Sequence, residues 1–438
     1  MGRVARAASL AACSFLSGTA DAQENVLLIL ADDLGVDRVA AYGAHPDPGN
    51  TPNIDSLAER GVLFRRAWSY PVCSPTRATI MTGRYGFRTG IGMLIRESSD
   101  SVVGLSLEEQ TLPEVIAPSY SSAVLGKWHL ANNFTQGVTH PLDSGFDYHA
   151  GSMFNLQGQS SANEQNYFDW QKNVNGVIEN STTYATTDTV DDALRAMETL
   201  PEPWFIYLPF NAPHKPFHAP PDHLHSFDLS GNPDNSPVVH MMAMTEAMDT
   251  EIGRLMAGVD ESNTTVIFLG DNGTSESATT APFDPEHAKG TLYEGGINVP
   301  FIVVSPRVSE PGSECDALVC ATDIFPTVRE IAGLGGGSRD GVSLLPYLAD
   351  PSRQSIRPYI YSEIFGPNGS TSYNRLRRAI RNGRYKLIDR RTDLEREFYD
   401  LETDPFELND LLQGDMTLEQ ATALCELETA LVRLWNTR

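Results

Sequence analysis

Short apolar runs alternate with polar clusters through most of the chain. Each run is bounded by polar or turn-forming residues, and several are followed by a pattern with helical spacing. This order is typical of an α/β fold, in which a large, mostly parallel central sheet is flanked by helices. The predicted strands cover 25–30, 122–125, 204–208, 264–269 and 299–304, and the predicted helices cover 52–60, 75–81, 241–256 and 323–332.

From about residue 350 the apolar runs become shorter. They cover 359–361, 377–380, 385–388 and 397–399, and a helical pattern follows over 418–435. The Asn382-Gly383 pair between two of the runs is characteristic of a tight hairpin. We therefore predict a smaller C-terminal antiparallel sheet with a helix packed on it. The mature chain then divides into a main domain, 23–350, and a C-terminal subdomain, 351–438.

The segment 151–187 differs from both regions. It is rich in Asn, Gln, Ser and Gly and shows no clear apolar period. We expect a long surface loop there, of the kind that can face a substrate.

The N-terminus has the pattern of an export signal. Arg3 and Arg6 precede a short apolar stretch, and Ala20-Asp21-Ala22 fits a small-x-small cleavage site. Residues 1–22 are therefore predicted to be a signal peptide, which places the mature protein in the periplasm or outside the cell. A lipoprotein anchored at Cys13 is the alternative. No later segment is long and apolar enough to predict a transmembrane span.

Composition narrows the set of partners. The chain has 438 residues, 41% of them hydrophobic, and a formal net charge of −25. This charge argues against nucleic acid and anionic membrane surfaces as partners. It also repels a small anionic ligand, so a site for one needs local cations.

Cysteine pairing stays open at the level of the sequence. Export leaves Cys73, Cys315, Cys320 and Cys425 in the mature chain. A disulfide between Cys315 and Cys320, or between Cys320 and Cys425, is compatible with an oxidising compartment. Free buried thiols are equally compatible, because spacing alone does not fix geometry.

Two oxygen-rich pairs follow two of the predicted strands. Asp32 and Asp33 end the first strand, and Asp271 and Asn272 end the strand over 264–269. Either pair alone is most often a solvated turn. The carboxyl ends of parallel strands meet at one edge of a sheet, however, and side-chain oxygens suit Ca²⁺ or Mg²⁺. No Cys-x-x-Cys pair is present to indicate a softer metal.

The run Cys73-Ser74-Pro75-Thr76-Arg77 predicts a helix start. Ser74 suits an N-cap and Pro75 suits the first turn. Free backbone N–H groups at a helix start favour an anion, and Arg77 adds a fixed cation. A lone Cys at such a place is usually a buried structural residue. This position also suits a negatively charged nucleophile or a bound oxyanion.

Several motifs together resemble the formylglycine-dependent sulfatases, of the arylsulfatase A type and with an alkaline phosphatase-like fold. The run at 73–77 continues into Ala-Thr-Ile-Met-Thr-Gly83, as in the sulfatase signature. The further matching segments are Gly126-Lys127-Trp128-His129-Leu130, Asn211-Ala-Pro-His214-Lys-Pro216, Lys289-Gly-Thr-Leu-Tyr-Glu-Gly-Gly296, Glu397-Phe-Tyr-Asp-Leu401 and Asp404-Pro405. Asn298 is a departure, because many relatives carry Arg there, and this affects substrate contacts rather than the core chemistry.

The resemblance implies a modified nucleophile and a metal. A maturation enzyme would oxidise Cys73 to formylglycine. Asp32, Asp33, Asp271 and Asn272, with the converted Cys73, would hold Ca²⁺, with Mg²⁺ less favoured. Residues 23–350 would then be the catalytic domain of a sulfuric ester hydrolase.

The resemblance also implies a role for each of the cationic residues. The hydrated aldehyde would attack sulfur with help from Arg77, and Lys127 and Lys289 would stabilise the sulfuryl oxygens. His214, with Lys289, would protonate the leaving alcohol, and His129 would deprotonate the second hydroxyl, which expels sulfate. Lys127 and His129 alternate on an extended segment, so we expect both to point to one face.

Two other functions remain open. A phosphodiesterase or phosphonate monoester hydrolase would use the same fold and a similar nucleophile, and a non-catalytic oxyanion-binding protein would leave Cys73 unconverted. The sulfate ester itself, whether a small molecule or a carbohydrate, is not determined. We expect substrate contacts from the 151–187 loop and from Trp128, Phe217, His218 and Tyr293.

Overall fold

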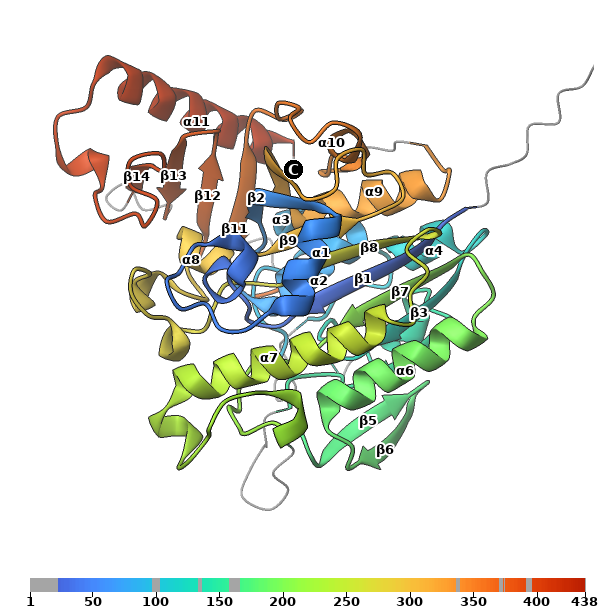
Figure 1. Cartoon of the computed structure of the whole chain (residues 1–438). Helices are drawn as coiled ribbons and strands as arrows, with labels where there is room; N and C mark the ends of the chain where they lie inside the picture. The colour runs from blue at the N-terminus through green and yellow to red at the C-terminus, as the bar shows by residue number, and fades with distance from the viewer. Residues whose placement is uncertain are drawn as a thin grey trace, which may run out of the picture.

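The computed structural model contains both predicted sheets (Figure 1). It describes residues 23–96, 103–132, 136–156, 166–335, 339–369, 373, 375–390 and 396–437. The predicted signal peptide, including Cys13, lies outside these residues. One sheet has ten strands and the other has four. The predicted fold class, a large α/β layer with a smaller antiparallel sheet and helix, is confirmed.

The large sheet is parallel at its centre and antiparallel toward its edges. Its strand order is β10-β2-β9-β8-β1-β7-β3-β4-β5-β6. The five neighbours from β8 to β4 run parallel, whereas β9, β5 and β6 pair antiparallel with their neighbours, and β10 pairs parallel with β2. The bounds are β1 Asn25–Ala31, β2 Val62–Trp68, β3 Ser121–Leu125, β4 Tyr148–Gly151, β5 Trp170–Val174, β6 Val177–Ser181, β7 Trp204–Pro209, β8 Thr264–Gly270, β9 Phe301–Val304 and β10 Ser313–Cys320.

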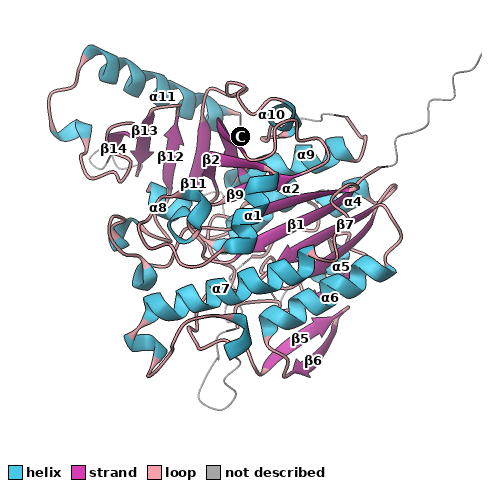
Figure 2. Cartoon of the chain, in the orientation of Figure 1, coloured by secondary structure: helices cyan, strands magenta, loops and turns pink. Residues whose placement is uncertain are grey.

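Strand β1 lies at the middle of this sheet and contributes to a core on each face. Val26, Leu28 and Leu30 pack on one side, and Leu27 and Ile29 pack on the other. Because side chains alternate along a strand, a continuous apolar run is what a strand buried on both faces requires. Helices cover both faces of the sheet (Figure 2).

The helices divide between the two faces. Those that share the core of Val26, Leu28 and Leu30 are α2 Cys73–Thr82, α4 Leu112–Ile116, α9 Ile324–Ile331 and α10 Leu345–Ala349. Those that share the core of Leu27 and Ile29 are α1 Pro52–Arg60, α6 Ala185–Thr199 and α7 Pro237–Met256. The shorter helices α3 Gly86–Thr89, α5 His140–Asp143 and α8 Glu294–Ile297 lie in connections.

The small sheet is formed by the C-terminal part of the chain. Its strands are β11 Ile360–Ile364, β12 Arg377–Arg381, β13 Tyr385–Asp389 and β14 Arg396–Asp400, and each pairs antiparallel with the next. Helix α11, Leu418–Asn436, lies across it (Figure 1). The other side of the sheet packs on the large domain, where Ala379 and Ile388 contact a cluster that contains Trp68 and Leu292.

Some predicted elements differ from the observed ones. Helix α2 begins at Cys73 with Val72 at its N-cap, and the Ser74 hydroxyl instead accepts a hydrogen bond from the backbone N–H of Ile95, at 3.1 Å. The prediction of a loop over 151–187 was wrong for β5 and β6, which form a hairpin at the edge of the sheet. The polar composition of this hairpin reflects its exposed edge strand rather than an absence of structure. Residues 157–165 of the segment lie outside the described part.

The four cysteines among the described residues are free. Cys73, Cys315 and Cys320 are buried, and Cys425 is exposed on α11. Neither of the two disulfides considered above is formed. Among the described residues no helix combines the length and the apolarity that crossing a bilayer requires.

Candidate active site

The site lies where the central parallel strands end. Asp32 follows β1, Lys127 follows β3 and Asp271 follows β8. Backbone hydrogen bonds join these ends laterally, since Asp32 donates to Ala212 O at 3.0 Å and Lys127 donates to Pro209 O at 2.7 Å. The N-terminus of α2 meets the same edge. The prediction that the polar clusters converge at the carboxyl edge of the sheet is therefore confirmed.

Gly126 allows the chain to turn from β3 into this edge. Its φ is 116°, a conformation that L side chains rarely adopt, and a Cβ there would lie 2.1 Å from the carbonyl oxygen of Pro209. Only glycine avoids both the strain and the clash. The backbone approach of Gly126 to β7 thus places Lys127 beside Asp32.

Cys73 lies against the first acidic pair. Its Sγ donates to Asp32 Oδ1 at 3.3 Å, and the Nζ of Lys289 lies 3.7 Å from the same sulfur. Cys73 and Asp32 are fully buried, and the side chain of Lys289 is 15% exposed. A ligand would therefore approach the candidate nucleophile, Cys73, from the side of Lys289 and not from the side of the sheet.

Arg77 and Asp271 form a buried ion pair one helical turn behind Cys73. The guanidinium donates to Asp271 Oδ2 at 2.8 and 3.2 Å and to the carbonyl oxygen of Lys127 at 2.7 Å. The hydroxyl of Thr76 donates to the carbonyl oxygen of Asp271 at 2.6 Å. These bonds fix α2 to the ends of β8 and β3, which holds Cys73 in position.

Two lysines neutralise the acidic pair. Lys127 donates to Asp32 and Lys289 donates to Asp33 in short hydrogen bonds. Burial alone would raise the pKa of Asp32, but the charges of Lys127, His214 and Arg77 outweigh burial and hold that pKa well below its ordinary value. Burial would lower the pKa of Lys289, but the charge of Asp33 outweighs burial and raises that pKa. Both residues thus stay charged at neutral pH.

The unmodified thiol is not activated by this environment. Burial, followed by the nearby carboxylates of Asp271 and Asp32, raises the pKa of Cys73 well above its ordinary value. The helix start is predicted to suit an anionic nucleophile or a bound oxyanion, and for the encoded thiol the nearby carboxylates oppose a negative charge. The two carboxylates outweigh the helix terminus and the lysines, so Cys73 as encoded is a neutral thiol.

His214 contacts the same group from the turn that follows β7. Its Nε2 lies 3.8 Å from Asp33 Oδ2, and its Nδ1 is 2.5 Å from the carbonyl oxygen of Lys215. Burial lowers the pKa of His214 to about 4, even though Asp33 opposes the shift. His214 is therefore neutral at pH 7 in this arrangement.

His129 lies beyond the end of β3 with a φ of 58°. The segment is not extended there, so alternation along a strand does not explain its direction. Its Nε2 is 2.9 Å from the carbonyl oxygen of Ile95, and its Nδ1 is buried with no hydrogen-bond partner. Burial and the charges of Lys127 and Arg77 lower its pKa well below the ordinary value. His129 is thus a neutral base beside the cations of the site.

Several of these side chains fit a hard cation. One ligand atom each from Asp32, Asp33, Cys73 and His214 lies within 4.8 Å of the others. Asn272 adds an oxygen, because its Nδ2 donates to Asp33 Oδ1 at 2.8 Å while its own Oδ1 is buried with no hydrogen-bond partner. A buried amide oxygen without a partner is costly, and metal ligation would satisfy it.

One of the predicted ligands, Asp271, has other hydrogen-bond partners in the structure. Asp271 lies beside the group, but its carboxylate is held by Arg77 and by the backbone N–H of Asp33, which donates to Oδ1 at 3.1 Å. His214, which the sequence placed only among the catalytic residues, also has a nitrogen in the compact group. The other four predicted ligands, Asp32, Asp33, Cys73 and Asn272, lie together.

The predicted substrate contacts divide into buried and accessible residues. Trp128 is fully buried, donates to His140 Nδ1 at 3.1 Å and packs on Phe146, so it belongs to the core. His218 contacts Tyr167 and Tyr184, with ring centroids 4.3 and 5.6 Å apart. His218 therefore stays a predicted substrate contact, whereas the burial of Trp128 argues against a contact between its side chain and a substrate.

Tyr167 was missed by the sequence analysis. Its buried hydroxyl lies 2.6 Å from the carbonyl oxygen of Asn211 and 2.7 Å from that of His214. It therefore fixes the backbone turn that carries His214. Its place in a segment predicted to be a loop gave no signal, because a tyrosine reveals its hydrogen-bond partners only after the chain has folded.

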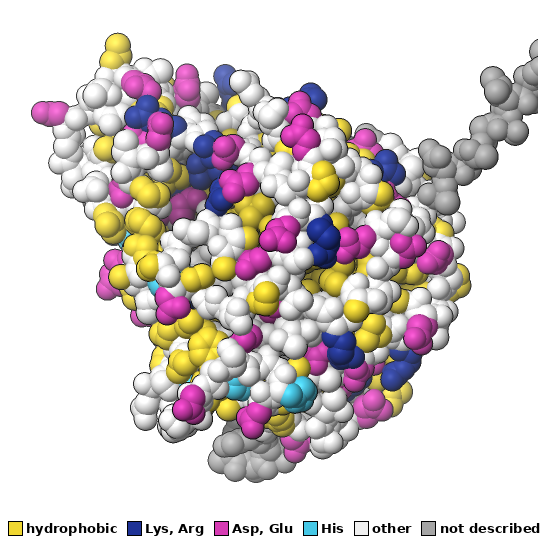
Figure 3. Space-filling view, viewed as in Figure 1, with side chains coloured by type: hydrophobic (Ala, Val, Ile, Leu, Met, Phe, Trp, Pro, Cys, Tyr) yellow, Lys and Arg dark blue, Asp and Glu magenta, His cyan; other side chains and the backbone are white. Residues whose placement is uncertain are grey.

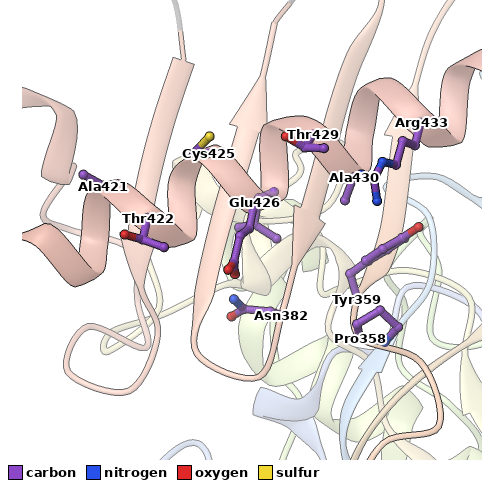
Figure 4. A pocket seen from close by; sticks show the side chains of 11 residues that line it. Pro358, Tyr359, Asn382, Ala421, Thr422, Cys425, Glu426, Thr429, Ala430 and Arg433 are labelled. Atoms are coloured by element: carbon purple, nitrogen blue, oxygen red, sulfur yellow. The ribbon is translucent and has the colours of Figure 1, made fainter.

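A groove of about 640 Å³ lies apart from this site, between α11 and the turn that joins β12 to β13 (Figure 4). Tyr359 and Asn382 line it opposite Glu426 and Ala430 of α11, and none of the predicted site residues lines it. We do not include it in the active site.

Family models match both parts of the chain. The model described as Sulfatase matches residues 24–334, and the model described as N-sulphoglucosamine sulphohydrolase, C-terminal, matches residues 286–434. The first match covers well over half of the chain.

Curated relatives agree with this match. The chain is 30% identical over 373 residues to N-acetylgalactosamine-6-sulfatase of Homo sapiens, which covers 77% of this chain and 68% of the relative. It is 29% identical over 332 residues to arylsulfatase J of Mus musculus, which covers 72% of this chain and 54% of the relative. This chain thus spans about half to two thirds of the length of these relatives.

Solved structures show the same fold. The crystal structure of Ps i-CgsB has a TM-score of 0.77 at 24% identity, with 93% of this chain and 92% of the other covered. A structure solved in complex with its substrate D-glucosamine-2-N,6-O-disulfate has a TM-score of 0.74 at 20% identity, with 94% and 98% covered. The sequence match to the family model, together with the human relative, establishes that this chain belongs to the sulfatase family.

Proposed function

We propose that this protein hydrolyses a sulfate ester to an alcohol or phenol and inorganic sulfate. The observation that carries the proposal is the arrangement around Cys73. Its sulfur lies at a helix start, 3.3 Å from Asp32 and 3.7 Å from Lys289, in a chain of the sulfatase family. An anion at this place meets the free N–H groups of α2 and the cations that surround it.

Cys73 is proposed to act after conversion to formylglycine by a maturation enzyme. The raised pKa of the thiol supports this, because a buried neutral thiol is a poor nucleophile. The converted residue, when hydrated, supplies a hydroxyl nucleophile and a second hydroxyl that permits release of the sulfate group. The surrounding residues then determine where the charge and the protons go.

The cations of the site are proposed to bind the sulfate oxygens. Lys127 and Lys289 are held by Asp32 and Asp33, so their positions are fixed before a ligand arrives. Preorganised charges of this kind act without reorganisation during the reaction. Arg77 is buried behind Cys73 and bonded to Asp271, which suits orienting the nucleophile better than contacting the substrate.

The two histidines and Lys289 are proposed to move protons. The Nζ of Lys289 lies 3.7 Å from Cys73 Sγ, and the Nε2 of His214 lies 3.8 Å from Asp33 Oδ2. A bound sulfate would oppose the lowering of the His214 pKa and favour its protonated form. These two groups would protonate the leaving alcohol, and the neutral His129 would accept a proton from the nucleophile in the step that releases sulfate.

We propose that Asp32, Asp33, residue 73, Asp271 and Asn272 hold a calcium ion, with His214 alongside. Calcium accepts six to eight oxygen ligands in flexible geometry, which these carboxylates and the unpartnered Asn272 oxygen suit better than the strict octahedron of Mg²⁺. When bound, the ion would act as a Lewis acid at the sulfate group.

The substrate is proposed to be a small-molecule or carbohydrate sulfate ester. Acidic and basic side chains are interspersed on the face shown in Figure 3. The attraction for an anion therefore has to come from the buried cations of the site rather than from the surface as a whole.

Export and the domain division are also proposals. We propose that residues 1–22 are a signal peptide, so that the mature protein is periplasmic or secreted. We further propose a catalytic domain over 23–350 and a C-terminal subdomain over 351–438. Between α10, which ends at Ala349, and β11, which begins at Ile360, the chain passes from one sheet to the other, and this supports the boundary.

A substrate panel tests the proposal. Protein from a host with the maturation enzyme is given an aryl sulfate, a phosphomonoester and a phosphodiester, and the mass of the peptide that contains Cys73 is measured. We expect turnover of the sulfate and a mass that shows sulfur and two hydrogens replaced by one oxygen. Faster turnover of the diester would contradict the proposal, and so would an unmodified thiol in protein from the native host.

A further inference from the structure

A second cationic pocket lies next to Lys289, between the two sheets of the molecule. Its volume is about 200 Å³, and it is formed by the segment 286–293 on one side and the small sheet on the other. Arg377 at the start of β12 and Arg390 after β13 line it, opposite His287 and Tyr293. We call it the arginine pocket.

The wall of the arginine pocket is close to Cys73 through two contacts. Gly290 lines it and directly follows Lys289, whose Nζ lies 3.7 Å from Cys73 Sγ. The backbone N–H of Gly290 donates to the carbonyl oxygen of Pro71 at 2.8 Å, and Pro71 is two residues before Cys73. Consecutive Cα atoms are about 3.8 Å apart. The wall of the pocket is therefore one peptide unit and one lysine side chain away from the nucleophile.

Arg377 offers an uncommitted charge to this pocket. The residue is exposed, and within the described part of the chain its side chain has no hydrogen bond and no ion pair. Most other arginines in the C-terminal part are paired, as Arg384 is with Asp400 at 2.7 Å. A free guanidinium presents a planar fork that matches a carboxylate or a sulfate group.

Arg390 is held in place at the opposite side. It forms a short ion pair with Glu397 and donates to the hydroxyl of Tyr293 at 3.2 Å. The Tyr293 ring stacks on His287, with centroids 3.6 Å apart and planes 17° apart. These contacts fix the wall before a ligand binds, which lowers the entropic cost of binding.

We propose that the arginine pocket binds a second anionic group of the substrate, a sulfate or a carboxylate, while the ester to be cleaved lies at Cys73. This rests on the proposed sulfatase activity. The substrates of this protein would then be esters that carry at least two anionic groups, such as a charged saccharide, rather than simple aryl sulfates. Glu286 also lines the pocket, and its carboxylate would select against ligands that fill the whole space with negative charge.

The experiment compares matched substrates in two arms. A singly sulfated sugar glycoside is measured beside the same glycoside with an added carboxylate and beside the same glycoside with an added sulfate. The readout is the ratio of kcat/KM for the doubly charged compound to that for the singly charged one. The arm with the larger ratio identifies which anion the pocket prefers.

Arg377→Gln removes the free charge, and Arg353→Gln is the control. Arg353 is likewise exposed, and it does not line the pocket. We expect Arg377→Gln to lower the ratio about tenfold, or about 1.4 kcal/mol, mainly through KM. Arg377→Lys should restore part of the ratio because it keeps the charge and loses the fork. An unchanged ratio in Arg377→Gln would overturn the inference.

A binding measurement separates this inference from the proposed activity. Calorimetry with Cys73→Ala protein reports binding of the doubly charged compound without turnover. Weaker binding after Arg377→Gln, with Arg353→Gln unchanged, supports the pocket even if no sulfate ester is hydrolysed by the converted enzyme. Hydrolysis of sulfate esters together with binding that does not depend on Arg377 would overturn the pocket alone.

Discussion

The ammonium group of Lys289 lies 3.7 Å from the sulfur of Cys73, although 216 residues separate them in the chain. Lys289 also pairs with Asp33, so one side chain joins the acidic pair to the nucleophile candidate. This contact makes the loop before α8 part of the site.

Replacing Lys289 should therefore reduce catalysis more than folding. Its charge is proposed to meet the sulfate oxygens, and removal of one preorganised donor typically costs about 10²–10³ in kcat. We expect Lys289→Met to lower kcat/KM for an aryl sulfate by about that factor. Lys215→Met is the control, since the Lys215 side chain is exposed beside His214. Equal activity of the two variants would exclude Lys289 from the reaction.

Calcium should stabilise the protein through Asn272. A ligand that binds only the folded state stabilises it by about 2.7 kcal/mol at one hundred times its Kd. We expect Tm to rise when calcium is added to chelator-treated protein, and to rise less in Asn272→Leu. Asn298→Leu is the matched control, because its Oδ1 is also buried without a hydrogen-bond partner but lies outside the predicted ligand set. A full calcium response in Asn272→Leu would remove Asn272 from the ligands.

Tyr167 should act through the position of His214. Its hydroxyl contacts the carbonyl oxygens of Asn211 and His214, and a hydrogen bond of this kind is worth about 1 kcal/mol net. Tyr167→Phe should lower kcat by up to about tenfold and leave KM nearly unchanged. Tyr184→Phe serves as control, since that hydroxyl contacts His218 at 3.1 Å. If the two variants behave alike, the contact with the His214 turn has no special role.

A buried charge cluster joins the C-terminal sheet to α8. Lys386 lies 2.8 Å from Glu407 and 3.0 Å from Glu294, and Arg381 lies 3.2 Å from Glu294. Burial raises the pKa of Glu407 to about 7, with Lys386 opposing the shift and Glu294 adding to it. The folded state therefore binds a proton more tightly at Glu407 than the unfolded state does.

Proton binding at Glu407 makes the free energy of unfolding depend on pH. The contribution of Glu407 to stability is complete below its unfolded pKa of 4.5 and is lost as pH rises through about 7. The slope for one proton is at most about 1.4 kcal/mol per pH unit. As the pH rises from 5 to 8, the Tm of Glu407→Gln should therefore rise relative to the Tm of the unchanged protein.

The variant Glu402→Gln is the control for Glu407→Gln. Glu402→Gln changes an exposed carboxyl in the same region and should show a difference in Tm that stays constant with pH. A Tm difference for Glu407→Gln that falls with rising pH would mean that the ion pair with Lys386 outweighs burial.

The local pattern of apolar and polar residues predicted much of the fold. The apolar run of β1 is continuous because the strand is buried on both faces. The runs after residue 350 are shorter because their strands are short, although α11 covers one face of that sheet and the large domain covers the other. The predictions were wrong where the local sequence favoured one structure and the tertiary contacts of the segment favoured another. The β5–β6 hairpin is polar because it forms an exposed edge, and Val72 replaces Ser74 as N-cap because Ser74 bonds to Ile95.

By itself, the sequence determined the strand ends that carry Asp32, Lys127 and Asp271, and the helix start that carries Cys73. These depend on chain periodicity and on residues adjacent in the chain. Only the tertiary structure decided that Lys289 reaches Cys73, that Tyr167 supports His214 and that Arg377 faces a pocket beside the site. Each of these contacts joins segments far apart in the chain, and their approach is fixed by the packing of the two sheets rather than by any local preference.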